Sequence, residues 1–179
     1  RVVLLVLVVL GDACARTAYT GRFRTTYRTE DEEIAVADGA VASYRRGVRP
    51  VADETMRARV ARVADAVVVA AKAGPAGERA RRLAWDVVVV EGPDASVASF
   101  ANGAMFVQAA LVRAMPSDDA LAAVLGTAIA RVLLRHGEEA AGRSSFNRGL
   151  TAMGQLGSLG GGSRVDLAEE QDEEADYVG

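Results

Sequence analysis

Apolar residues recur at helical spacing between residues 54 and 73. Asp53 precedes this segment as a suitable N-cap residue, and Gly74 with Pro75 ends it. A helix is therefore predicted over residues 54–73. Its core face is expected to contain Met56, Val60, Val63, Ala64 and Val67.

A second amphipathic helix is predicted from Asp118, in the segment "DDALAAVLGTAIARVLLRHGEE". Ser117 is a suitable N-cap, and the two aspartates at the start favour the positive end of the helix dipole. The apolar surface of this helix is interrupted by a polar row made of Thr127, Arg131 and Arg135. Another helix is expected over residues 30–44, again with acidic residues in its first turn.

Strands are predicted where β-branched residues cluster. "WDVVVVEG" at 85–92 is one strand, and "SVASFANGAMFVQAALV" at 96–112 indicates two more, joined by a turn at Asn102-Gly103. Residues 142–163 are rich in glycine and serine and predict a loop, and "LAEEQDEEADYVG" predicts a final acidic helix. The expected fold class is α+β, with helices on one side of a small, mostly antiparallel sheet and the 118–139 helix central.

Composition narrows the function. The 179 residues suffice for a single domain with a core. The 21 basic and 24 acidic residues give a net charge of −3, which excludes the basic surface typical of nucleic-acid binding. A single cysteine allows no disulfide within the chain, and a single histidine limits any metal site built on imidazole.

The start of the chain predicts a targeting segment. "VVLLVLVVL" is too short to span a bilayer and has the length of a signal-peptide apolar region. "GDAC" follows and is similar to a lipoprotein signal ending at Cys14, although Leu10 lies one place too early and Asp12 adds a charge. The alternative is a buried strand with a free thiol.

The order of the later motifs resembles a known family. "WDVVVV" precedes "VASFANGAMFVQAALV", then comes "LAAVLGTAIARVLLRHG" and, after the glycine-rich gap, "EADYVG". With the start "CARTAYTGR", this order resembles the zinc metallopeptidases related to HtpX, Oma and the CAAX prenyl proteases (metallopeptidase family forty-eight). The bacterial periplasmic, often lipid-anchored members are the most similar. The resemblance covers residues 14–179 and implies a zincin-like fold, a zinc cofactor and proteolysis in protein quality control.

The departures from the family pattern fall on its catalytic residues. The family helix carries HExxH, whose two histidines bind zinc and whose glutamate activates water. The resemblance places these three positions at Thr127, Ala128 and Arg131. It places the third ligand at Asp172, with Asp176 in the second shell of the site. The substrate-binding edge strand corresponds to Ser99, Phe100, Ala101, Asn102 and Gly103.

These residues do not predict an ordinary catalytic zinc site, so no cofactor is expected. Threonine is a poor ligand, arginine remains a cation, and Ala128 accepts no proton. We expect Arg131 to pair with Asp172 or Asp176 where the metal would lie. The alternative reading is purely structural: Thr127 bonds back to a helix carbonyl and Arg131 extends into solvent.

Two further metal sites are weaker candidates. His136 with Glu139 offers a substitute pair of ligands, but a histidine near a helix end more often serves the dipole. An acidic cluster offers weak calcium binding, although such a run is more often a solvated helix face. That cluster comprises Glu169, Glu170, Asp172, Glu173 and Glu174.

Three functions remain open at this stage. The first is a pseudo-peptidase of the bacterial envelope that has lost zinc and binds protein or peptide clients. The second is an active zinc endopeptidase whose site residues are altered in this sequence, and the third is a structural envelope domain. The expected organisation is a signal-like segment over 1–14, an arm and helix over 15–52, and a metallopeptidase-like domain over 53–179, truncated at its C-terminal end. A lipid at Cys14 would attach the protein to the membrane, and no nucleic-acid partner is expected.

Overall fold

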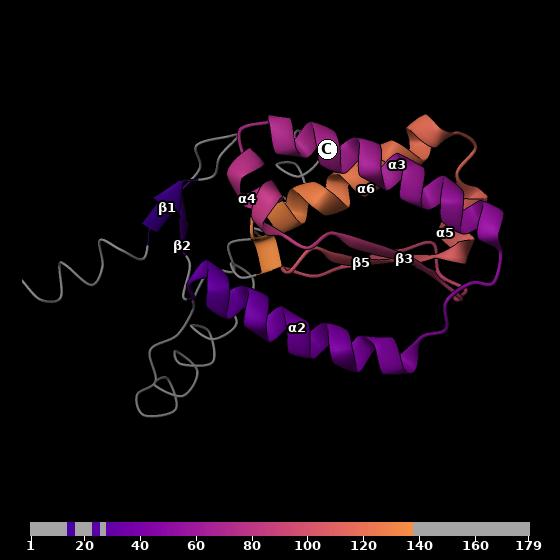
Figure 1. Cartoon of the computed structure of the whole chain (residues 1–179), viewed down its shortest axis with the longest axis horizontal. Helices are drawn as coiled ribbons and strands as arrows, with labels where there is room; N and C mark the ends of the chain where they lie inside the picture. The colour runs from indigo at the N-terminus through magenta and orange to yellow at the C-terminus, as the bar shows by residue number, and fades with distance from the viewer. Residues whose placement is uncertain (1–13, 17–22, 26–27, 138–179) are drawn as a thin grey trace, which may run out of the picture.

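The computed structural model describes residues 14–16, 23–25 and 28–137. These residues form an α+β fold, as predicted, in which helices pack against a small three-stranded sheet (Figure 1). In chain order the described elements are β1 (Cys14–Arg16), β2 (Phe23–Thr25), α2 (Glu30–Gly47), α3 (Glu54–Ala73), α4 (Gly77–Arg82), β3 (Asp86–Val90), β4 (Val97–Ser99), β5 (Ala104–Gln108), α5 (Ala109–Ala114) and α6 (Asp118–Leu133). Within this part of the chain, no helix combines the length and hydropathy of a membrane span.

The main sheet is mixed, in the order β3-β5-β4, so the expectation of a mostly antiparallel sheet is wrong. β4 and β5 form the predicted antiparallel hairpin, and β5 then lies beside β3 and runs parallel to it. Because helices lie on both faces of this sheet, its central strand β5 is buried on both sides, which explains its apolar run. Every residue from Ala104 to Val107 is buried.

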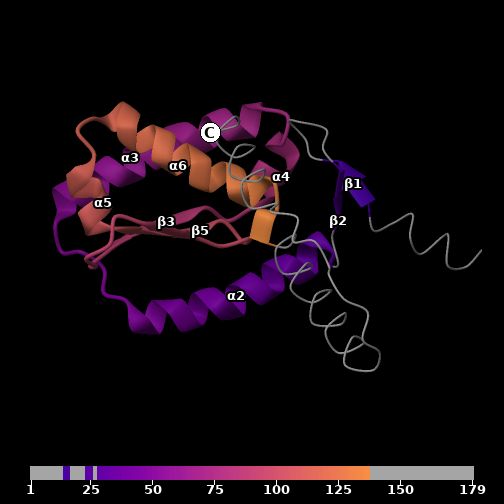
Figure 2. The ribbon, with the colours of Figure 1, turned by 180° about the vertical axis from the view of Figure 1, so that it is seen from behind.

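Helices cover both faces of this sheet rather than one. α3 and α6 lie on one face and α2 lies on the other (Figures 1 and 2). Alternate residues of β5 serve the two layers, because successive side chains of a strand point to opposite faces. Met105 and Val107 join the core under α3 and α6, while Ala104 and Phe106 pack in the cluster that includes Val41 of α2.

The two longest predicted helices begin where the sequence places them. Asp53 accepts a hydrogen bond from the Met56 N–H at 3.0 Å, and α3 ends at Gly74. Ser117 accepts one from the Ala120 N–H at 3.1 Å, and α6 follows. Both caps are therefore confirmed, although α6 ends at Leu133, before the end of its amphipathic pattern.

Two short helices differ from the predictions. The segment that follows β5 was expected to continue as a strand to residue 112, but it forms α5. Its apolar run fits a buried strand or a buried helix equally well, and periodicity cannot separate them over six residues. α4 was not predicted, and Gly77 at its start lies so close to α3 that an added Cβ would stand 2.3 Å from the Lys72 carbonyl oxygen.

Arg59 fixes the start of α6 against α3. Its Nε donates to Asp118 Oδ1 at 2.8 Å, and its Nη atoms donate to the carbonyls of Val112 and Met115, each at 3.3 Å. Arg62, one turn further along α3, donates to the other oxygen of Asp118 at 2.9 Å. These hydrogen bonds hold the pKa of Asp118 below its ordinary value, because they favour the charged carboxylate.

The far end of α6 is tied to α2 by a buried ion pair. Arg135 Nε lies 2.5 Å from Oε2 of Glu33, in the first turn of α2, and Arg135 Nη2 donates to the Arg28 carbonyl at 2.9 Å. Arg135 follows α6 with a φ of 59°, the left-handed conformation in which glycine usually ends a helix. Its N–H donates to the Val132 carbonyl at 3.2 Å. The turn that ends α6 therefore brings this guanidinium to α2.

Arg79 of α4 completes the cluster. Its Nη2 lies 3.4 Å from Glu33 Oε2, and its Nε donates to the Val132 carbonyl at 3.3 Å. Its Nη1 forms an ion pair with Glu30 Oε1 at 3.0 Å. Burial lowers the pKa of Arg79, while the carboxylates of Glu33 and Glu30 oppose that effect. Three helices thus meet at one charged cluster.

The stability that Asp118 contributes is expected to be lost in acid. Its folded-state pKa lies below that of an unfolded aspartate, about 4. The contribution is therefore complete above about pH 4 and falls as the pH drops through the lowered value. Urea unfolding of the wild type and Asp118→Asn should show a constant difference at neutral and mildly acid pH, and a shrinking one below about pH 4. Asp65→Asn, at an exposed position of α3, is the control. A difference that persists unchanged in strong acid would contradict the prediction.

Candidate functional site

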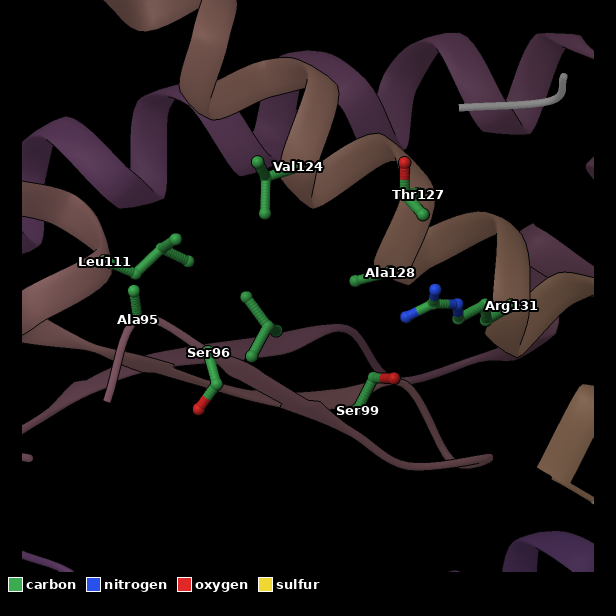
Figure 3. Close-up of a pocket in the computed structure, with 9 residues that line it drawn as sticks. Ala95, Ser96, Ser99, Leu111, Val124, Thr127, Ala128 and Arg131 are labelled. Carbon is green, nitrogen blue, oxygen red and sulfur yellow. The ribbon is translucent and has the colours of Figure 1, made fainter. Parts of the chain in front are cut away.

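A cavity of about 370 Å³ lies between β4 and α6. Three of the predicted site positions on α6 and the first residue of the predicted edge strand meet there (Figure 3). The lining residues are Ala95, Ser96, Val97, Ser99, Leu111, Val124, Thr127, Ala128 and Arg131. The fold thus brings Ser99 to the substituted motif, across about thirty residues of sequence.

Thr127 and Ala128 give this cavity no reactive group. The Thr127 hydroxyl donates to the Ala123 carbonyl at 3.1 Å and points away from the cavity (Figure 3). This is the hydrogen bond from Thr127 to a helix carbonyl that a purely structural role predicts. Ala128 is buried and presents only its methyl group to the cavity.

Arg131 is the charged residue among the described residues that line this cavity. The residue is exposed, yet its side chain extends along the cavity, with the guanidinium between Ala128 and Ser99 in Figure 3. A cation therefore stands close to where the family resemblance would place a metal. This position is accessible to solvent and to a ligand.

The outer edge of β4 runs beside the cavity that Val97 and Ser99 line. The Phe100 N–H donates to the Ala104 carbonyl at 2.9 Å, and the Gln108 N–H donates to the Ser96 carbonyl at 3.1 Å. In an antiparallel ladder the residues between such pairs point their N–H and C=O groups outward. Val97 and Ser99 therefore direct theirs away from β5, and within the described residues no strand pairs with this edge.

The segment before β4 is held by Gln108. Its Oε1 accepts from the Asp94 N–H at 3.0 Å, and its Nε2 donates to Ser96 Oγ at 3.0 Å. Gly92 allows this arrangement, since a Cβ there would lie 2.1 Å from the Gln108 Oε1. The start of the edge strand is thus positioned by a side chain from its neighbour.

A second cavity, of about 240 Å³, lies beside the first. It shares Ser99 and Arg131 with the first cavity and extends past Phe100 and Ala101. Its remaining lining residues are Glu33, Val132, Arg135, His136 and Gly137. We call the two cavities together with the outer edge of β4 the β4 groove.

The predicted edge strand is only partly correct. Ser99 ends β4, whereas Ala101, Asn102 and Gly103 lie in the turn. Asn102 serves that turn, because its Oδ1 accepts from the Ala104 N–H at 3.1 Å and its Nδ2 donates to Asp38 of α2 at 2.7 Å. Gly103 has a φ of 93°, and an added Cβ would lie 3.2 Å from the backbone of Ala84, so any other residue would be strained here.

Phe100 contributes mainly to packing on the other face of the sheet. Its ring lies 5.6 Å from that of Tyr44 and 5.8 Å from that of Phe106, in edge-to-face contacts beneath α2. Phe100 also lines the second cavity. It therefore links the end of the groove to the α2 layer.

Sequence reasoning missed the apolar end of the cavity. Leu111 lies on the unpredicted helix α5, and the strand expected for this segment does not place it in the first cavity. Val124 was accessible to prediction, because it lies one helical turn before Thr127 and Ala128 on the same face. Val97 was also accessible to prediction, because it lies two residues before Ser99 in β4 and the side chains of residues i and i+2 in a strand share a face.

Several candidate residues lie outside the described residues. They are the remaining proposed ligand Asp172, its neighbour Asp176, Glu139, and the acidic cluster of 169–174. The signal-like residues 1–13 also lie outside, while Cys14 begins β1 and pairs with Thr25 of β2. His136 is buried and lines the second cavity. Within the described part, no group of three or more His, Cys, Asp or Glu is placed to hold a metal ion.

Comparison with models of known protein families and with curated proteins gives no match for this chain. The resemblance to zinc metallopeptidases therefore stays a hypothesis that rests on the order of motifs.

Loss of the Arg131 side chain is expected to cost little stability. Because Arg131 is exposed, any ion pair that it forms with Asp172 or Asp176 is screened, and Arg131→Ala should cost less than about 1 kcal/mol. Arg135 is the matched control, since Arg135→Ala leaves Glu33 buried with one cation fewer and should cost about 3 kcal/mol. Urea unfolding of both variants measures the difference. Equal losses would show that Arg131 is a buried structural link.

Proposed function

We propose that this protein is a pseudo-peptidase: a zinc-metallopeptidase-like fold that no longer hydrolyses peptides and instead binds extended segments of client proteins. One observation carries the proposal. Thr127, Ala128 and Arg131 line the same cavity as Ser99, beside an edge of β4 whose backbone groups point outward. This is the arrangement that the resemblance implies for a peptidase groove, with its catalytic side chains replaced.

The residues present do not fit a zinc ion. The Thr127 hydroxyl is directed to a helix carbonyl. The Arg131 guanidinium extends along the cavity, where its positive charge would repel a dication. Ala128 cannot take a proton from a water molecule. Neither a metal ligand nor a general base is offered by this turn of α6, which supports binding without hydrolysis.

The edge of β4 supports peptide binding in a different way. An extended peptide that adds to a sheet edge gains main-chain hydrogen bonds, while pockets for alternate side chains give selectivity. Val97 and Ser99 offer the outward N–H and C=O groups, and the cavity beneath α6 lies on the side of their side chains. The backbone contacts need none of the lost catalytic side chains.

The location of this function follows the same resemblance. We place the protein in the bacterial envelope, on the periplasmic side, with a lipid at Cys14 as its attachment to the membrane. Its partners are then unfolded or loosely folded client segments, which expose backbone that a sheet edge can pair.

Removal of one outward N–H is expected to weaken peptide binding without removing the fold. Ser99→Pro deletes the N–H that faces the groove together with the serine hydroxyl, and proline is tolerated at such positions of edge strands. Ser99→Ala keeps that N–H and is the matched control. Binding of unfolded casein, measured by fluorescence anisotropy, should fall about tenfold for Ser99→Pro and change little for Ser99→Ala. Val97→Pro provides a second variant if Ser99→Pro is unstable. Unchanged binding in both proline variants would exclude this edge as the binding site.

The purified protein is expected to hold less than one equivalent of zinc and to leave casein uncleaved. The fourfold variant Thr127→His, Ala128→Glu, Arg131→His and Asp172→Glu should recover zinc binding, because it restores all three ligands and the base on an intact scaffold. Elemental analysis after dialysis measures both proteins. Stoichiometric zinc with chelator-sensitive cleavage in the wild type would overturn the loss of activity. A folded fourfold variant without zinc would show that the alignment of the site is wrong.

A further inference from the structure

The β4 groove changes from apolar to cationic along its length. Leu111, Val124 and Val97 line only the first cavity, whereas Arg131 and Ser99 line both cavities and so mark the junction between them. Figure 3 shows the same order, with Leu111 and Val124 at one end and Arg131 over Ser99 at the other. Among the described residues that line the first cavity, Arg131 is the one charged side chain.

Among the described residues that line the two cavities, the one carboxylate already has cationic partners. Glu33 lines the second cavity, but it is buried and shared between Arg135 and Arg79. Glu33 is therefore committed to two other arginines, and Arg131 is the charged side chain that lines both cavities. A guanidinium carries five N–H donors, so a partner elsewhere in the chain does not exhaust Arg131.

We propose that the groove selects an extended peptide with an acidic side chain two residues before an apolar one. This inference rests on the proposed function. A peptide that runs antiparallel to β4 places one residue beside Ser99 and, two residues later, another beside Val97. Both side chains point to the same face, about 7 Å apart. The first meets Arg131 through a charge-assisted hydrogen bond, and the second enters the apolar end formed by Leu111 and Val124.

The antiparallel direction is the more stable of the two that this edge allows. Val97 and Ser99 each offer an N–H and a C=O, which an antiparallel partner pairs with one residue opposite and a parallel partner pairs, slightly less stably, with two different residues. The order acidic–any–apolar is therefore specific to this direction. A parallel peptide would show the reverse order.

A random octapeptide library displayed on phage and selected on the full chain tests this proposal. Wild-type protein should enrich Asp or Glu two residues before Val, Ile or Leu, relative to selection on Ser99→Pro. Selection on Arg131→Gln should keep the apolar preference and lose the acidic one, and Arg131→Lys should restore part of it. Synthetic peptides from the enriched set, made with Glu or with Gln, should differ about tenfold in affinity at low salt, and less at high salt.

The possible failures are distinguishable. If wild-type protein enriches no sequences beyond Ser99→Pro, the peptide-binding function itself is overturned. If it enriches peptides without an acidic position, peptide binding stands and the charge selection is wrong. Acidic enrichment that survives Arg131→Gln would exclude Arg131 as the group that reads the charge, and the reverse order of the two residues would overturn the antiparallel orientation.

Discussion

The buried carboxylate of Glu33 is the contact on which the described structure most depends. It binds Arg135, just beyond α6, and Arg79 of α4, so that α2 and α6, on opposite faces of the sheet, are joined at one end. A buried charge without a partner costs several kcal/mol, so each of the three side chains requires the others. The opposite end of α6 is held by Arg59 through Asp118. With both ends fixed, the distance between α6 and β4 is set, and this distance defines the groove.

The sequence predicted those features of the fold that depend on residues close together in the chain. Asp53 and Ser117 cap their helices as the sequence indicates, because a cap depends on residues within one turn. The parallel pairing of β3 with β5 was not predictable in this way, since it is decided by how the hairpin lies against a distant strand. The pair of Glu33 and Arg135 also left no signal, because neither residue has a local pattern that names its partner across 102 positions.

The candidate site combines side-chain groups on α6 with backbone groups on β4. The motif order placed Thr127, Ala128 and Arg131 beside Ser99, and the structure brings these four residues around one cavity. Substitutions affect these two kinds of group differently. A catalytic turn is lost when two or three side chains change, whereas the outward amides of Val97 and Ser99 are present whatever side chains these residues carry, proline excepted. A fold can therefore keep a surface for extended chains after it loses the means to cut them.

The sequence separation of Glu33 and Arg135 has a consequence during synthesis. A ribosome adds about 5–20 residues each second, so about 5–20 s pass between the emergence of the first side chain and that of the second. Arg79 is synthesised before Arg135, so Glu33 has only one of its two arginine partners during the later part of this interval. The link from α2 to the end of α6 therefore forms only after every strand of the main sheet has been synthesised.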